Sequence, residues 1–209
     1  MSGSDSRAAA SRDLPAPPDT AAARAALAVA TEHLTPSLLN HSIRSWHWAL
    51  GFAERDGVGP VDEELLYVGA VLHDLALVEP FDAHRTPFEH AGGAVASVLA
   101  AGAGWDAGRR AHLAAAIVAH MSPDPVAEGG VEGRLLDVAT ALDIAGARPD
   151  DLPHAYRAAV LAAYPRLDLA REFADLAADQ AARKPASQAA RIVHGGVAAK
   201  LAANPLERI

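Results

Sequence analysis

Two side chains that commonly bind metal ions, His73 and Asp74, are neighbours in an otherwise apolar stretch, residues 67–76. The stretch has the composition of a buried helix, and a buried helix rarely holds adjacent ionisable groups unless their charge is neutralised. A divalent cation would neutralise them, because imidazole nitrogen and carboxylate oxygen are common ligands of first-row metals. The alternative is a pair at a helix end, with Asp74 turned toward solvent.

Two other polar residues occur at positions that the sequence pattern assigns to the interior. His41 lies on the apolar stripe of a helix predicted for residues 38–55, where it is either a ligand or a core histidine bonded to a backbone carbonyl. Asp143 lies in the apolar segment 138–145, where an unpaired carboxylate would cost several kcal/mol or be protonated. Solvent exposure near the helix end is the alternative for Asp143. Asp137, six residues earlier, is the rival candidate for the carboxylate, but it fits a surface position better than Asp143 does.

Further histidines accompany this set. His120 ends an apolar segment, and His90 follows Glu89 where another helix is predicted to begin. Taken singly, each histidine fits a structural or exposed role better than the role of a ligand. The order of a histidine, a His-Asp pair and a distant aspartate, all on apolar helices, nevertheless predicts one site with two imidazoles and two carboxylates. Such a site suits a divalent first-row metal.

The composition of the chain limits the classes of function. The 209 residues suffice for one domain, and the 51% hydrophobic and 21% charged residues are ordinary for a globular protein. Because the chain has no cysteine, any metal must be held by His, Asp, Glu or water. A formal net charge of -8 without a basic cluster argues against nucleic acid and anionic membranes as partners. Neither a signal peptide nor a membrane-spanning run is evident, so we expect a cytoplasmic protein.

Abundant alanine and the pattern of apolar residues predict an all-α fold of seven to nine helices. We expect a flexible tail over residues 1–18 and a single domain over residues 19–209. Loops are predicted at 77–87 and 122–130. The predicted helices are 21–30, 38–55, 62–74, 88–101, 106–120, 131–145, 153–163, 168–182 and 186–202.

The order of His41, the pair His73-Asp74 and Asp143 resembles that of the HD superfamily of metal-dependent hydrolases. That superfamily is all-helical and is named after its His-Asp pair. The resemblance covers about residues 37–150 and is closest to the cyanamide hydratase-like branch. The segments similar to that branch are 40–44, 72–75, 88–93, 117–120, 142–146 and 204–206.

The resemblance implies a single-domain helical bundle of the HD type with a divalent metal, zinc or iron first and manganese or nickel as further candidates. The residues implied as metal ligands are His41, His73, Asp74 and Asp143. Those implied to act in the pocket, support the site or touch substrate are His120, Arg44 and Glu89. His90, in a context partly similar to that of dinuclear members, could complete a second metal site with His120. The roles of His47, His84 and His112 stay open.

The leading hypothesis for function is a metal enzyme that activates water to attack a small molecule, such as a cyanamide- or nitrile-like substrate. An alternative is a phosphohydrolase acting on a nucleotide or phosphate ester, with phosphate held by Arg44, Arg85 or Arg134. A dinuclear di-iron oxygenase and a non-catalytic scaffold are further alternatives. The expected partner is a small-molecule substrate, and the Ala-rich C-terminal helices could form a homo-oligomer interface.

Overall fold

The computed structural model describes residues 14–209, and all regular elements in this range are helices, which confirms the all-α prediction. The α-helices are α1 Ala21–His33, α2 Pro36–Asp56, α3 Glu63–Leu72, α4 Phe88–Gly102, α5 Ala107–Ala119, α6 Pro125–Ala145, α7 His154–Ala163, α8 Leu169–Arg183, α9 Gln188–His194 and α10 Val197–Ala202. Three short 3₁₀ helices are Leu75–Leu77, Pro149–Asp151 and Pro205–Arg208. Most of the predicted tail, residues 1–13, lies outside the described range. Residues 14–18, which the sequence analysis assigns to the tail, are described, and Leu14 packs against the core.

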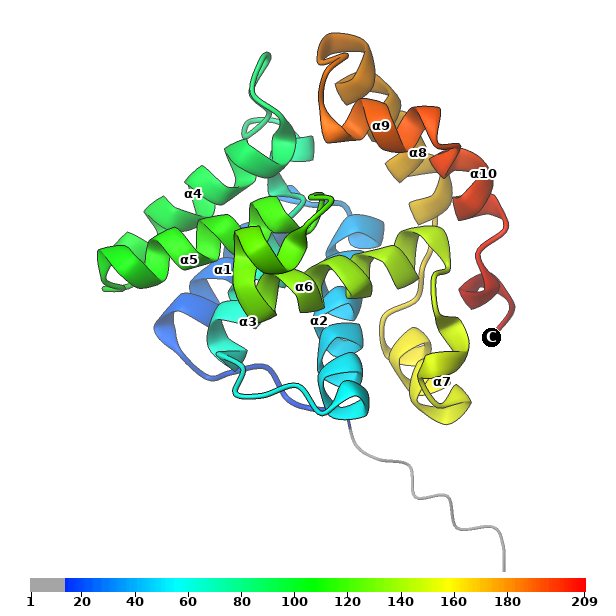
Figure 1. Ribbon diagram of the computed structural model, residues 1–209, viewed down its shortest axis with the longest axis horizontal. Helices are drawn as coiled ribbons and strands as arrows, with labels where there is room; N and C mark the ends of the chain where they lie inside the picture. The colour runs from blue at the N-terminus through cyan, green and yellow to red at the C-terminus, as the bar shows by residue number, and fades with distance from the viewer. Residues whose placement is uncertain (1–13) are drawn as a thin grey trace, which may run out of the picture.

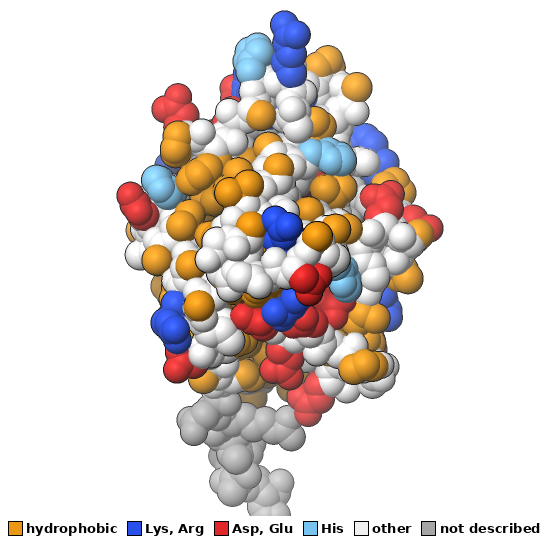
Figure 2. Space-filling model, turned by 90° about the vertical axis from the view of Figure 1, so that its left-hand side faces the viewer, with side chains coloured by type: hydrophobic (Ala, Val, Ile, Leu, Met, Phe, Trp, Pro, Cys, Tyr) orange, Lys and Arg blue, Asp and Glu red, His pale blue; other side chains and the backbone are white. Residues whose placement is uncertain are grey.

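The two longest helices, α2 and α6, cross near the centre of the molecule, with α4 and α5 on one side and α8 to α10 on the other (Figure 1). One continuous hydrophobic cluster joins these groups and includes Trp48 from α2, Leu136 from α6 and Phe173 from α8. On the side where α4 and α5 lie, hydrophobic side chains are interspersed with charges of both signs (Figure 2). Within residues 14–209, no helix is both long and apolar enough to cross a membrane.

Helix starts follow the capping residues in the sequence. Asp62 and Asp106, both predicted to start helices, accept hydrogen bonds from the backbone amides of the third residues after them. Helix α2 begins earlier than predicted, because Thr35 rather than Ser37 is its N-cap and Pro36 occupies the first turn. The N-cap residue of α2 thus lies two residues before the predicted one.

Two predicted segments differ from the structure, and glycine explains both. The predicted loop 122–130 is largely helical, since α6 begins at Pro125 and is interrupted only at Gly130, whose φ of 63° and ψ of -150° are not helical. The predicted helix 186–202 is two helices, α9 and α10, separated at Gly195 and Gly196; Gly196 has a φ of 75°. This division raises the number of α-helices in the described range to ten.

Small residues let α5 and α6 approach closely. A Cβ atom added to Gly129 would lie 2.4 Å from the Cβ of Ala119, and one added to Gly133 would lie 2.8 Å from the same atom. Both glycines therefore make room for the end of α5, which His120 follows directly. The close packing brings His120 toward the helix that carries Asp143.

Candidate metal centre

Three buried side chains, His41 from α2 and His73 and Asp74 from the end of α3, point ligand atoms at one another. The Nε2 atoms of the two histidines are 3.2 Å apart. Oδ2 of Asp74 lies 3.3 Å from Nε2 of His41 and 3.2 Å from Nε2 of His73. A tetrahedral ion with bonds of about 2.0–2.1 Å separates its ligand atoms by about 3.3–3.4 Å. The three spacings therefore fit three corners of such a site.

Hydrogen bonds on the far side of each ring set the protonation of both histidines. Nδ1 of His41 lies 2.8 Å from Oδ2 of Asp143, and Nδ1 of His73 lies 2.7 Å from the carbonyl oxygen of Ala70. Since these acceptors need a proton on Nδ1, each neutral ring presents the lone pair of Nε2 to the centre. Neither carboxylate oxygen of Asp74 has a hydrogen-bond partner. Lone pairs that converge in this way need a cation or a proton between them, and such outer hydrogen bonds are typical of metal-ligating histidines.

The pKa shifts express the same electrostatics. Burial by itself raises the pKa of Asp74, but the imidazoles of His73 and His41 outweigh it, and the net shift is downward. For His41, burial alone lowers the pKa, whereas the hydrogen bond to Asp143 and the nearby carboxylate of Asp74 outweigh burial and raise it. The group thus attracts positive charge, which a bound metal ion would supply in place of a proton.

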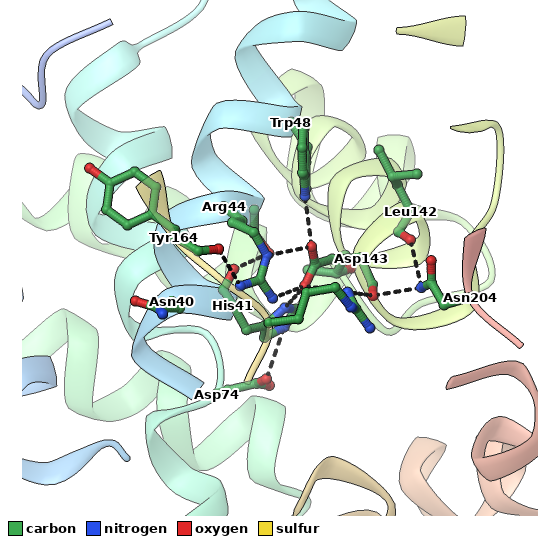
Figure 3. Close-up of polar contacts among 12 residues, drawn as sticks. Asn40, His41, Arg44, Trp48, Asp74, Leu142, Asp143, Tyr164 and Asn204 are labelled. Atoms are coloured by element: carbon green, nitrogen blue, oxygen red, sulfur yellow. Dashed lines mark hydrogen bonds and ion pairs between the residues drawn. The ribbon is translucent and has the colours of Figure 1, made fainter. Parts of the chain in front are cut away.

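Asp143 lies behind His41, whereas the sequence predicts it as the fourth metal ligand. Its Oδ1 accepts hydrogen bonds from Nε of Arg44 at 2.9 Å and from Nε1 of Trp48 at 2.7 Å (Figure 3). Its Oδ2 accepts from Nη2 of Arg44 at 2.6 Å and from Nδ1 of His41. Because these donors use both oxygens, Asp143 orients His41 in this structure, and the converging ligand atoms come from three residues.

The backbone around Asp143 is tied to two C-terminal segments. The carbonyl oxygen of Asp143 accepts hydrogen bonds from Nη1 of Arg166 at 2.7 Å and from Nδ2 of Asn204 at 2.9 Å (Figure 3). Nη1 of Arg44 donates in turn to the carbonyl oxygen of Tyr164 at 3.0 Å. Arg44 is fully buried and pairs with Asp143, but it does not line the cavity. Arg166 has no local sequence signal that marks it as buried.

The other predicted site residues separate into two groups. His120 is buried beside the centre; its Nδ1 donates to the carbonyl oxygen of Ile117, and its Nε2 lies 3.9 Å from Oδ1 of Asp74. Burial lowers the pKa of His120 to about 3, so the ring is neutral at physiological pH. Glu89 is buried, and burial raises its pKa, but it does not line the cavity. His90 is exposed on α4, so the structure does not bring it to His120 to form a second metal site.

A cavity of about 330 Å³ opens over the metal-binding group. Asp137, Thr140 and Ile144 from α6 line the cavity, and further lining residues come from α8, α9 and α10. None of Arg44, Arg85 and Arg134 lines the cavity. Asp137 is half-buried in it, although the sequence suggested a surface position.

The carboxyl group of Asp137 should make stability depend on pH. Burial raises its pKa from 3.8 to about 6, so between these values the folded state keeps a proton that the unfolded state has released. Stability therefore falls as the pH rises through this window, and the cost persists above it. Because Asp137 is partly solvent-exposed, we expect Asp137→Asn to stabilise the metal-free protein by only about 1 kcal/mol at neutral pH.

Urea unfolding of the wild type and the variant across the acidic to neutral range tests this expectation. The gain in free energy of unfolding caused by Asp137→Asn should shrink toward zero below the ordinary pKa of an aspartate. Asp175→Asn, at an exposed position on α8, removes the same charge and should show no such pH dependence. A gain for Asp137→Asn that is equal at all pH values would contradict the raised pKa.

Comparisons with known proteins agree with the geometry. The family model for the HD domain matches residues 38–145, a segment that contains His41, the pair His73-Asp74 and Asp143. Two curated proteins of Saccharomyces cerevisiae, cyanamide hydratase DDI2 and cyanamide hydratase DDI3, are each 28% identical to the chain over 172 residues. These matches cover 81% of this chain and 76% of each relative.

Proposed function

The chain belongs to the HD domain family, and from that premise we propose that it is a metal-dependent enzyme that activates water to attack a small nitrile-like molecule such as cyanamide. The observation that carries the proposal is the convergence of ligand atoms from His41, His73 and Asp74, with both imidazole lone pairs turned inward. The names of the two yeast relatives support the choice of hydration as the reaction. Their identity of 28% leaves the substrate itself a proposal.

Each residue has a role that follows from its contacts. A divalent cation held by His41, His73 and Asp74 would lower the pKa of a water molecule and polarise the nitrile. Asp143 keeps the proton of His41 on Nδ1. His120 is neutral, and because its Nδ1 donates to a carbonyl, its Nε2 is free to accept a proton from water and return it to the nitrile nitrogen. In hydration the water oxygen bonds to the nitrile carbon and both protons reach the nitrogen.

The alternatives have less support. The three arginines expected to hold a phosphate in a phosphohydrolase do not line the cavity: Arg44 pairs with Asp143, Arg134 lies 3.5 Å from Asp56, and Arg85 is exposed. A dinuclear oxygenase would need further ligands, and His90 is exposed and does not line the cavity. A single metal and water activation account for the described geometry with fewer assumptions.

Two measurements test the proposal. Protein purified without chelator should contain close to one equivalent of a first-row metal, with zinc or iron expected, or take it up on addition. The metal-loaded enzyme should convert cyanamide to urea. Failure to bind any added divalent metal would overturn the metal-dependent mechanism. Metal binding without turnover of cyanamide or simple nitriles would reject hydration of such substrates.

A further inference from the structure

Two basic side chains, Arg191 on α9 and Lys200 on α10, line the cavity over the metal-binding group. Within residues 14–209, neither makes an ion pair or a side-chain hydrogen bond in the structure, although both belong to an acidic chain. They lie in the C-terminal helices that cover the cavity, beyond the segment matched by the HD domain model. Neither residue belongs to a motif recognisable in the sequence.

Most other basic side chains of the described chain are already paired with acidic ones. Arg109 bridges Asp62 and Glu64, for example, and Lys184 contacts Asp82. The basic residues in residues 14–209 without an ion pair are Arg85, Arg110, Arg191, Lys200 and Arg208. Two of these five line the cavity. Their charges are thus available to a ligand at the site where the proposed chemistry would occur.

The rest of the cavity fits a ligand with an apolar body. Phe173, Ile192 and Val197, from the same three C-terminal helices, and Ile144 from α6 also line the cavity. Asp137 is the one carboxylate outside the metal-binding group that lines the cavity. A volume of about 330 Å³ lies within the range of pockets for ligands much larger than cyanamide. A substrate as small as cyanamide would neither fill the cavity nor use the charges of Arg191 and Lys200.

We propose that Arg191 and Lys200 bind an anionic group, a carboxylate or a phosphate, of a substrate whose reactive end lies at His41, His73 and Asp74. The inference rests on the proposed function and narrows its substrate class to small organic anions with a short apolar link. Guanidinium and ammonium groups are the usual protein partners of carboxylate and phosphate. The negative net charge would repel an anion at long range, so local cations are needed to retain it.

Calorimetric titration of the metal-loaded protein at about pH 7.5, where a carboxylic acid is ionised and lysine is protonated, tests the inference. The probes are butyrate, the neutral butyramide and inorganic phosphate. We expect butyrate or phosphate to bind more tightly than butyramide. The double variant Arg191→Gln/Lys200→Gln should bind the preferred anion at least about tenfold more weakly, with butyramide unchanged. The preferred anion identifies the group as carboxylate or phosphate.

The control variant Arg85→Gln/Arg208→Gln removes two unpaired cations outside the cavity and has the same net charge. It should bind the anion as the wild type does. Equal affinity of butyrate, phosphate and butyramide for the wild type, or equal losses in both double variants, would overturn the inference. If the metal alone holds the anion, the Arg191→Gln/Lys200→Gln variant should bind it with wild-type affinity, and this result would also overturn the inference. The titration measures anion affinity and needs no turnover, and metal content is measured in a separate experiment. Failure of this inference can therefore be distinguished from failure of the proposed function.

Discussion

Replacing Asp74 with Asn should abolish metal binding, and with it the proposed turnover. The substitution removes the only charged ligand of the converging group and can turn an amide N–H toward the lone pairs of His41 and His73. Changes to residues that only orient ligands typically cost about 10–100-fold in metal affinity, and loss of a ligand should cost more. Metal analysis of protein purified without chelator, followed by titration with zinc and iron, measures the loss.

Asp137→Asn is the matched control, because it removes a carboxylate from the same cavity but not from the metal-binding group. It should retain the full metal content. Circular dichroism separates a metal-free folded Asp74→Asn variant from an unfolded one, and the metal-free wild type is its reference. Wild-type metal content in Asp74→Asn would mean that the ion binds elsewhere.

The sequence was sufficient for features that depend on local chemistry. The helices follow from composition and from caps such as Asp62 and Asp106, and they agree with the structure except near glycines and at some ends. The pair His73-Asp74 was recognisable because two ionisable groups in an apolar helix require neutralisation. His41 was placed on the correct face of its helix by periodicity alone, and its partner across the cluster is 32 residues away in the chain.

The features that the sequence did not predict depend on tertiary packing. Metal binding by Asp143 stays a prediction, but the sequence did not show that Arg44, 99 residues earlier in the chain, pairs with it. Asp137 was assigned to the surface, because nothing local shows that α8 to α10 cover that face of α6. The same covering helices supply Arg191 and Lys200. In each case the side chain's role depends on a partner that is distant in sequence.

Asp143→Asn should weaken both the fold and the metal site. Asp143 is 0% exposed and carries the charge that compensates the equally buried Arg44, so its neutralisation leaves a guanidinium unpaired in the core. Breaking a buried pair in this way costs about 3–5 kcal/mol. Loss of the acceptor behind His41 should also reduce metal affinity by about 10–100-fold. Urea unfolding of the metal-free protein and metal titration measure the two effects separately.

A double variant separates orientation of His41 from stability of the fold. Arg44→Met/Asp143→Leu removes both buried charges, and replacing a whole buried pair with apolar groups is often neutral or stabilising. The double variant should therefore regain much of the lost stability, whereas metal affinity should stay about 10–100-fold below wild type, since Nδ1 of His41 still lacks its acceptor. A much greater loss of affinity would indicate that Asp143 becomes a fourth ligand when the metal binds. Wild-type affinity would show that Asp143 stabilises the fold without positioning His41.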